Sequence, residues 1–345
     1  MKKTVLAAAL AALTLGTAQA QTNVRLYGLA DAFAGNVKTS TPGASSSATK
    51  IDAGGMTTSY WGIGGTEDLG GGLKAVFAFE SFMRNDTGEL GRFNGDPAFA
   101  RSSFVGLEGG FGRVSLGRHT TPYFISTIVY NPFGDSFVFS PAVMHSYRGY
   151  LLNDSGWSNS IAYGGSFGPV RANLLYSLGL ERTSDPNRNA GRSLGGSLNY
   201  GQGPLGLNLS YQEVDVASGT PEAITKQKAF LLSGAYDLSV VKLFLQYQEM
   251  KDDRGSFNKK DKSYQIGASA PVGPGSVLAS YGHVKTTDND GTTADAKRDS
   301  WALGYDYFLS KRTDLYAAWF ETKLKAGSTV ASKSRAVGLG IRHRF

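Results

Sequence analysis

The chain has 345 residues, no cysteine and a formal net charge of +7 at pH 7. The missing cysteines exclude a disulfide framework and a thiolate metal site. The positive charge is spread along the sequence without a basic run, so it argues against nucleic-acid binding and favours at most a mild preference for anions.

Residues 1–20 predict a signal peptide. Lys2 and Lys3 form its basic start, an apolar run follows from 5 to 15, and 18–20 reads Ala-Gln-Ala, a small-x-small cleavage site. The apolar run is shorter than the ~20 residues that a membrane-spanning helix needs. We therefore expect cleavage after Ala20 and one mature domain over 21–345 that has no transmembrane helix.

The mature part alternates between polar and apolar residues with a period of two. In 335–345 the odd positions are mostly apolar and the even ones small or cationic, and 73–80 and 241–248 follow the same pattern. Lys74 and Glu80 fall on the polar face of their segment. Because half of each segment stays polar, a transmembrane β-barrel also explains a mean hydropathy as low as −0.21.

Tight turns and long polar stretches alternate between these segments. We expect seven turns, at 68–72, 109–112, 167–169, 202–204, 237–239, 271–275 and 310–312. Eight loops are expected at 35–55, 84–97, 119–155, 181–190, 216–225, 252–260, 288–296 and 325–333. Together they predict an all-β, antiparallel, 16-stranded transmembrane barrel around a water-filled lumen.

The sequence shows no motif for chemistry. Gly70 to Gly72 lacks the Lys-Ser/Thr of a phosphate-binding loop and predicts a hairpin turn. The four histidines have no metal-ligand spacing, and no serine, histidine and acid stand in a motif typical of a catalytic triad. We therefore expect no catalytic residue, metal or cofactor, and do not expect an enzyme.

Six segments, in this order, resemble the general porins of Gram-negative bacteria, especially those of β-proteobacteria. They are Val24–Asp31, Ser59–Glu80, Arg101–Gly109, Phe111–Arg118, Asn131–Asp135 and Gly340–Phe345. The resemblance implies a homotrimer whose third long loop folds into the pore. That loop would begin near His119 and carry Pro132, Phe133, Gly134 and Asp135. It also implies that the terminal Phe345 is the signal recognised by the barrel assembly machinery.

The sequence departs from the family at the expected constriction. Tyr60 and Gly64 stand where family members often have arginine, and Phe133 follows Pro132 where a glutamate is common. We place Arg101, Arg118 and Arg148 on the pore wall from their position beside the matched segments. Strand parity places Lys74 and Glu80 there, and we expect Asp135 and Tyr60 at the constriction as well. Alternatively, the three arginines lie at a wide, well-screened rim and Asp135 only shapes a turn.

The sequence thus predicts an outer-membrane porin for passive diffusion of ions and small hydrophilic solutes, with a mild anion preference. Its expected partners are outer-membrane lipid, lipopolysaccharide, the assembly machinery, small anions and hydrophilic solutes, but no nucleic acid. One alternative is a substrate-selective channel, because aromatic residues of 123–150 on an inward loop would narrow and dry the pore. A weaker alternative is a barrel adhesin.

Overall fold

The computed structural model describes residues 23–147, 154–179, 191–217, 224–254, 257–288 and 294–345. The predicted signal peptide with its cleavage site, and Arg148, lie outside these ranges. No helix in the described part is both long and apolar enough to cross a membrane.

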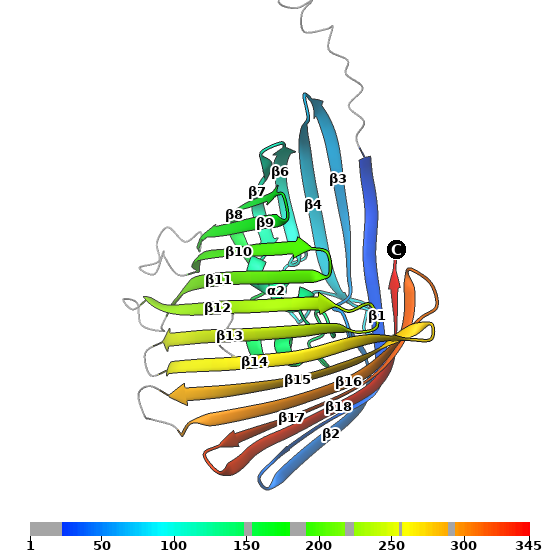
Figure 1. The fold of residues 1–345 in the computed structure, drawn as a ribbon, viewed down its shortest axis with the longest axis vertical. Coiled ribbons are helices and arrows are strands. Elements are labelled where there is room, and N and C mark those ends of the chain that lie inside the picture. The colour runs from blue at the N-terminus through cyan, green and yellow to red at the C-terminus, as the bar shows by residue number, and fades with distance from the viewer. Residues whose placement is uncertain (1–22, 148–153, 180–190, 218–223, 255–256, 289–293) are drawn as a thin grey trace, which may run out of the picture.

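The protein is a closed antiparallel β-barrel (Figure 1). Its sheet has 18 strands, but β2 and β3 together form one interrupted wall strand and the two-residue β5 pairs only with β4, so sixteen strands make the wall as predicted. The first nine labelled strands are β1 (Asn23–Thr41), β2 (Ala44–Ala53), β3 (Tyr60–Gly70), β4 (Leu73–Arg84), β5 (Glu89–Leu90), β6 (Ser102–Gly109), β7 (Gly112–Thr120), β8 (Gly156–Phe167) and β9 (Val170–Leu178). The others are β10 (Arg192–Gln202), β11 (Leu205–Ala217), β12 (Ile224–Asp237), β13 (Lys242–Arg254), β14 (Phe257–Val272), β15 (Gly275–Asp288), β16 (Ala296–Phe308), β17 (Thr313–Ala326) and β18 (Thr329–Arg344).

The barrel closes where β18 pairs with β1, from Leu29 opposite Arg344 to Ser40 opposite Lys333. Phe345 continues this seam: its N–H donates to the Gly28 carbonyl at 3.1 Å, and its own carbonyl accepts from the Gly28 N–H at 3.2 Å. A side chain at position 28 would collide with the ring of Phe345 and with the backbone of β3. The last residue is therefore built into the closed wall.

All seven predicted turns connect wall strands at one end of the barrel, but several predicted long loops are strand. β1 runs on to Thr41 and β2 resumes at Ala44, and β17 and β18 likewise continue to Ala326 and from Thr329. In these extensions polar side chains pair across the strands, as Asn36 does with Thr49 at 2.9 Å. Since neither face of the β1–β2 extension is apolar, hydrogen-bonded pairing continues there without the hydrophobic alternation that reveals a strand in a sequence.

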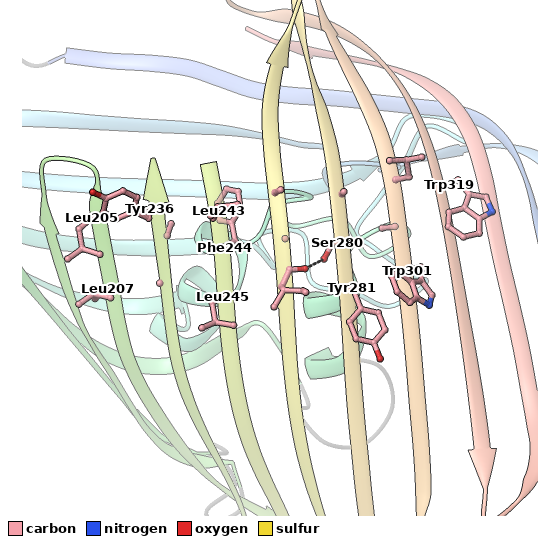
Figure 2. A pocket seen from close by; sticks show the side chains of 18 residues that line it. Leu205, Leu207, Tyr236, Leu243, Phe244, Leu245, Ser280, Tyr281, Trp301 and Trp319 are labelled. Atoms are coloured by element: carbon pink, nitrogen blue, oxygen red, sulfur yellow. Dashed lines mark hydrogen bonds between the residues drawn. The ribbon is translucent and has the colours of Figure 1, made fainter. Parts of the chain in front are cut away.

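Within the wall, side chains alternate between the outside and the lumen as predicted. In β18, Val337, Leu339 and Ile341 are exposed on the outer surface, whereas Ala336 and Arg342 are buried inside. Outward side chains of β11 to β17 line a shallow apolar groove of about 740 Å³, with Tyr236, Tyr281, Trp301 and Trp319 among the leucines (Figure 2). An apolar outer band with interspersed aromatic side chains is typical of a lipid-facing barrel wall.

The break between β2 and β3 is held by one buried carboxylate on β1. Asp31 accepts hydrogen bonds from the N–H groups of Met56 at 2.8 Å and Thr57 at 2.7 Å, and from the Tyr316 hydroxyl at 2.6 Å. Each donor would cost about 1–3 kcal/mol if it were left buried without a partner. Asp31 therefore fixes residues 54–59 as an inward bend of the wall.

Candidate pore constriction

A segment that connects β7 to β8 lies inside the barrel (Figure 1). Its described part, residues 121–147, is called the inner loop below, and it contains α2 (Pro122–Val129) and α3 (Pro141–Tyr147). Thr121 caps α2 by accepting a hydrogen bond from the N–H of Phe124 at 3.1 Å, and Pro122 starts the helix at a position where no N–H is needed. Short-range signals in the sequence thus define the helix.

α2 turns its polar face to the barrel wall. Ser126 lies 2.9 Å from Asn208 and from Ser210 on β11, and the Thr127 carbonyl accepts from the Gln246 side chain of β13 at 2.8 Å. The opposite face carries Ile125, Ile128 and Val129, spaced i, i+3, i+4, and Ile125 and Val129 are exposed. The helix is therefore amphipathic, but its polar face packs against the wall and its apolar face points to the lumen.

The tip of the inner loop is anchored to the wall by aromatic packing. Phe133 is 1 % exposed and belongs to a buried cluster with Phe33, Phe139 and Tyr316, while Pro132 fills the space above Gly267. Of the predicted loop residues, Pro132 and Phe133 thus face the wall, and Gly134 has a positive φ of 52° in the turn between them and Asp135.

The turn at the tip is organised by Asn131. Its side-chain amide donates to the carbonyls of Thr127 at 2.7 Å and Gly134 at 2.9 Å, and its side-chain oxygen accepts from the N–H of Phe133 at 2.9 Å.

Asp135, the next residue of the predicted loop, lines the lumen cavity, whereas Pro132 and Phe133 face the wall. Burial raises the pKa of Asp135, and a hydrogen bond with Thr57 and the charge of Arg101 partly offset that rise.

The inner loop and the wall from β4 to β10 enclose a cavity of about 1000 Å³, which is part of the lumen. Ile125, Ile128, Val129 and Phe137 line it from the loop side. The wall and the β5–β6 connection contribute hydroxyl and amide side chains, some apolar ones such as Phe104 and Leu175, and four arginines, Arg92, Arg101, Arg113 and Arg171. The loop side of this cavity is thus apolar, and the wall side is mixed and holds its arginines.

Two of the predicted residues form an ion pair in this cavity. The Arg101 guanidinium donates to Glu80 and lies 3.7 Å from the centre of the Tyr60 ring, while Glu80 also accepts from the Tyr27 hydroxyl at 2.8 Å. Glu80 thus lies on the lumen side of β4. Because Glu80 neutralises Arg101 at close range, the pair adds little net charge to the lumen.

Arg118 itself does not line the cavity and belongs to a second cluster of charges that includes Arg92. It donates to Asp154 at 2.5 Å and to the Ala100 carbonyl at 2.5 Å. Arg92 bridges two carboxylates, donating hydrogen bonds to Asp154 at 2.8 Å and to Asp96 at 2.9 Å. Although burial would raise the pKa of Asp154, hydrogen bonds from these arginines lower it. The cluster ties the β4–β6 connection to Asp154, two residues before β8.

Sequence reasoning missed the most accessible cations of the cavity, Arg113 and Arg171. Arg113 pairs with Glu108 at 2.6 Å, whereas Arg171 makes no ion pair with any residue that the structure describes. Parity could have found Arg113, which alternates with Ser115 opposite the apolar residues Val114 and Leu116 of the same strand.

The last predicted charge, Lys74, follows the β3–β4 turn, where it is exposed opposite Asp68 and Glu108 in the sheet register. It is not among the cavity residues. Over the described residues, no three His, Asp or Glu side chains are placed to hold a metal ion.

Known proteins match the sequence of this chain over its whole length. A family model described as Gram-negative porin matches residues 7–327. An outer membrane porin protein of Bordetella pertussis and outer membrane porin protein 32 of Delftia acidovorans are each 33 % identical to this chain over 100 % of both chains.

Solved structures agree with these relatives. An anion-selective porin from Comamonas acidovorans is 31 % identical, with a TM-score of 0.80 over 94 % of this chain and 100 % of its own. The trimer form of OmpT from Vibrio cholerae, 16 % identical, shares the fold with a TM-score of 0.68 over 94 % of this chain and 99 % of its own. By its full-length relatives and its closed barrel, the chain belongs to the Gram-negative porin family and is an outer-membrane channel for passive diffusion.

Proposed function

We propose that the pore conducts small hydrophilic solutes with a mild preference for anions. The observation that carries this proposal is the charge of the lumen cavity. Four arginines line it, together with three acids, Glu80, Glu108 and Asp135. Two of the acids pair with arginines, Asp135 has a raised pKa, and Arg171 makes no ion pair within the described residues. The anion-selective porin from Comamonas acidovorans, 31 % identical to this chain, supports a preference for anions over cations.

The mechanism needs no chemical step, so the proposed channel is not an enzyme. Cations in a narrow aqueous neck between low-dielectric walls raise the local concentration of anions and lower that of cations. Since most charges here are paired, the field in the neck stays small. We therefore expect a mild rather than a strict selectivity, with flux that rises linearly with solute concentration for ions such as chloride.

We also propose that three copies assemble as a homotrimer and that the assembly machinery recognises Phe345. Both follow from the porin resemblance, and the exposed ring of Phe345 at the β1–β18 seam supports the second. Light scattering of the detergent-extracted protein, corrected for bound detergent, would give three times the protomer mass. A monomer mass under mild extraction would contradict the trimer.

A row of lysines supports lipopolysaccharide as a partner. Lys262, Lys285, Lys297 and Lys325 lie directly opposite one another on β14 to β17, on the outward face and away from the tight turns. Like charges directly opposite in a sheet repel and destabilise it. Tyr281 lies two outward positions closer to the membrane than Lys285. We propose that phosphate groups of lipopolysaccharide in the outer leaflet lie between these lysines.

The double variant Lys262→Gln/Lys297→Gln should bind lipopolysaccharide at least about tenfold more weakly, since each lysine near an anionic surface contributes about 1 kcal/mol. Binding of the detergent-solubilised protein to immobilised lipopolysaccharide measures this. Lys242→Gln/Lys311→Gln is the matched control, because these exposed lysines lie at turns on the opposite rim. Equal losses in both double variants would contradict a specific lysine row.

Replacing Arg171 by glutamine should lower the anion-to-cation permeability ratio by about twofold, because the cavity then loses an arginine that has no ion-pair partner among the described residues. The zero-current potential of the purified protein in a planar bilayer under a tenfold KCl gradient measures the ratio. Arg335→Gln is the control, since Arg335 is exposed on the outer face of β18. An unchanged potential in Arg171→Gln, or a wild-type potential near zero, would refute the proposed selectivity.

The anion preference should rise as the pH is lowered. A carboxyl group is charged above its pKa and neutral below it, and burial raises the pKa of Asp135 above the ordinary value of 3.8. Asp135 therefore loses its negative charge at a higher pH than an exposed aspartate does. Zero-current potentials recorded from pH 8 to pH 4 should show this rise in the wild type, and a smaller one in Asp135→Asn. Identical pH profiles would exclude Asp135 as its source.

A further inference from the structure

The apolar face of α2 is exposed to the lumen rather than buried. Ile125 is 46 % exposed and Val129 is 55 % exposed, and Phe137, beyond the helix, is 38 % exposed. These three side chains and Ile128 border the same cavity. An aliphatic stripe in an aqueous pore is unfavourable, because water in contact with apolar surface raises the free energy in proportion to the area.

The stripe is held in place by strong contacts behind it. Tyr123 is fully buried and donates to Gln248 at 3.1 Å, the Tyr130 carbonyl accepts from Gln246 at 2.8 Å, and the Tyr130 hydroxyl donates to the Leu207 carbonyl at 3.0 Å. A rotation of α2 that buried Val129 would break these bonds and bring Ile125 against polar wall side chains. The orientation of the helix is thus determined by the wall, and the apolar lumen face follows from it.

Phe137 extends the stripe beyond the helix. Its ring stacks on Phe124 at a centroid distance of 6.1 Å and meets the edge of Tyr147 at 6.4 Å. Phe124 is only 8 % exposed, so Phe137 is the most exposed ring of this group. The lumen therefore offers one aromatic and three aliphatic side chains along one side.

The wall side of the cavity holds arginines that an anion in the lumen can reach. Arg113 and Arg171 are exposed, and Ser166 and Asn199 flank Arg171 in the sheet register. A carboxylate can accept hydrogen bonds from such an arginine and from the neighbouring hydroxyl and amide groups. Chloride could use this side alone, but a solute with both a carboxylate and an apolar body could use both sides at once.

We propose that the pore favours organic anions that carry one carboxylate on a compact apolar body. This inference rests on the proposed anion preference and adds the chemical class of the preferred solute. The carboxylate passes along the arginine side while the apolar body covers the stripe of Ile125, Ile128, Val129 and Phe137. The contact is partial, so the solute is held weakly enough to leave, which conduction requires.

Hexanoate and gluconate are a matched pair of probes, because each has six carbons and one carboxylate but only hexanoate has an apolar body. Their permeabilities relative to chloride are measured as bi-ionic potentials in planar bilayers at pH 8, with protein-free bilayers as the background. In Ile125→Thr/Val129→Thr the hexanoate-to-gluconate permeability ratio should fall about threefold, as expected when roughly 25 Å² of apolar contact is lost. Both positions are exposed, so folding should be unaffected.

Val330→Thr is the matched control, since Val330 is an exposed valine beside the β17–β18 turn, outside the cavity. It should leave the ratio unchanged, and none of the variants should alter the potassium-to-chloride potential. If Ile125→Thr/Val129→Thr keeps the wild-type ratio, the inference is wrong while the anion preference stands. If the proposed anion preference itself is wrong, the potassium-to-chloride potential of the wild type will be near zero, whatever the hexanoate-to-gluconate ratio.

Discussion

The lumen depends on one constraint, namely that no backbone N–H or C=O may face lipid without a partner. Closing β18 onto β1 satisfies it, and a wall of sixteen strands is then too wide for its own side chains to fill. The inner face of that wall is polar, with Asn208, Gln246 and Gln248 buried and hydrogen-bonded to the inner loop. The loop must therefore present hydrogen-bonding groups to the wall.

This requirement reverses the usual distribution of residues in α2. Ser126 and Thr127, which a helix in a soluble protein would turn to water, are buried at 2 % and 0 % exposure, and Val129 faces the lumen. The charged side chains near it are mostly compensated, through the pairs Glu80–Arg101 and Glu108–Arg113. We therefore attribute the proposed selectivity to a small excess of positive charge on one side of the cavity and an apolar surface on the other.

Much of the fold could be predicted from the sequence because strand alternation and tight turns are local signals. Parity placed Glu80 and Lys74 on the lumen face, and the seven turns lie where Gly, Pro, Asp and Ser cluster. The sequence predicts loops at the polar hairpins beyond the membrane, such as β1–β2, because both their faces are solvated.

The site was harder to predict because it depends on contacts between residues far apart in the sequence. Phe133 was expected in the pore, and only the neighbouring wall residues Phe33 and Tyr316 show that it anchors the loop. The sequence predicts Arg118 on the pore wall, because nothing local reveals its pairing with Asp154, 36 residues later.

The orientation of α2 can be measured directly, since the chain has no cysteine. Single cysteines at Val129 and at Ser126 would be treated with a charged, water-soluble thiol reagent while single channels are recorded. We expect rapid modification and a stepwise fall in conductance for Val129→Cys, and no change on the same timescale for Ser126→Cys. Rapid modification of Ser126→Cys with an inert Val129→Cys would show that the polar face lines the pore, and would contradict the reversed helix on which the selectivity depends.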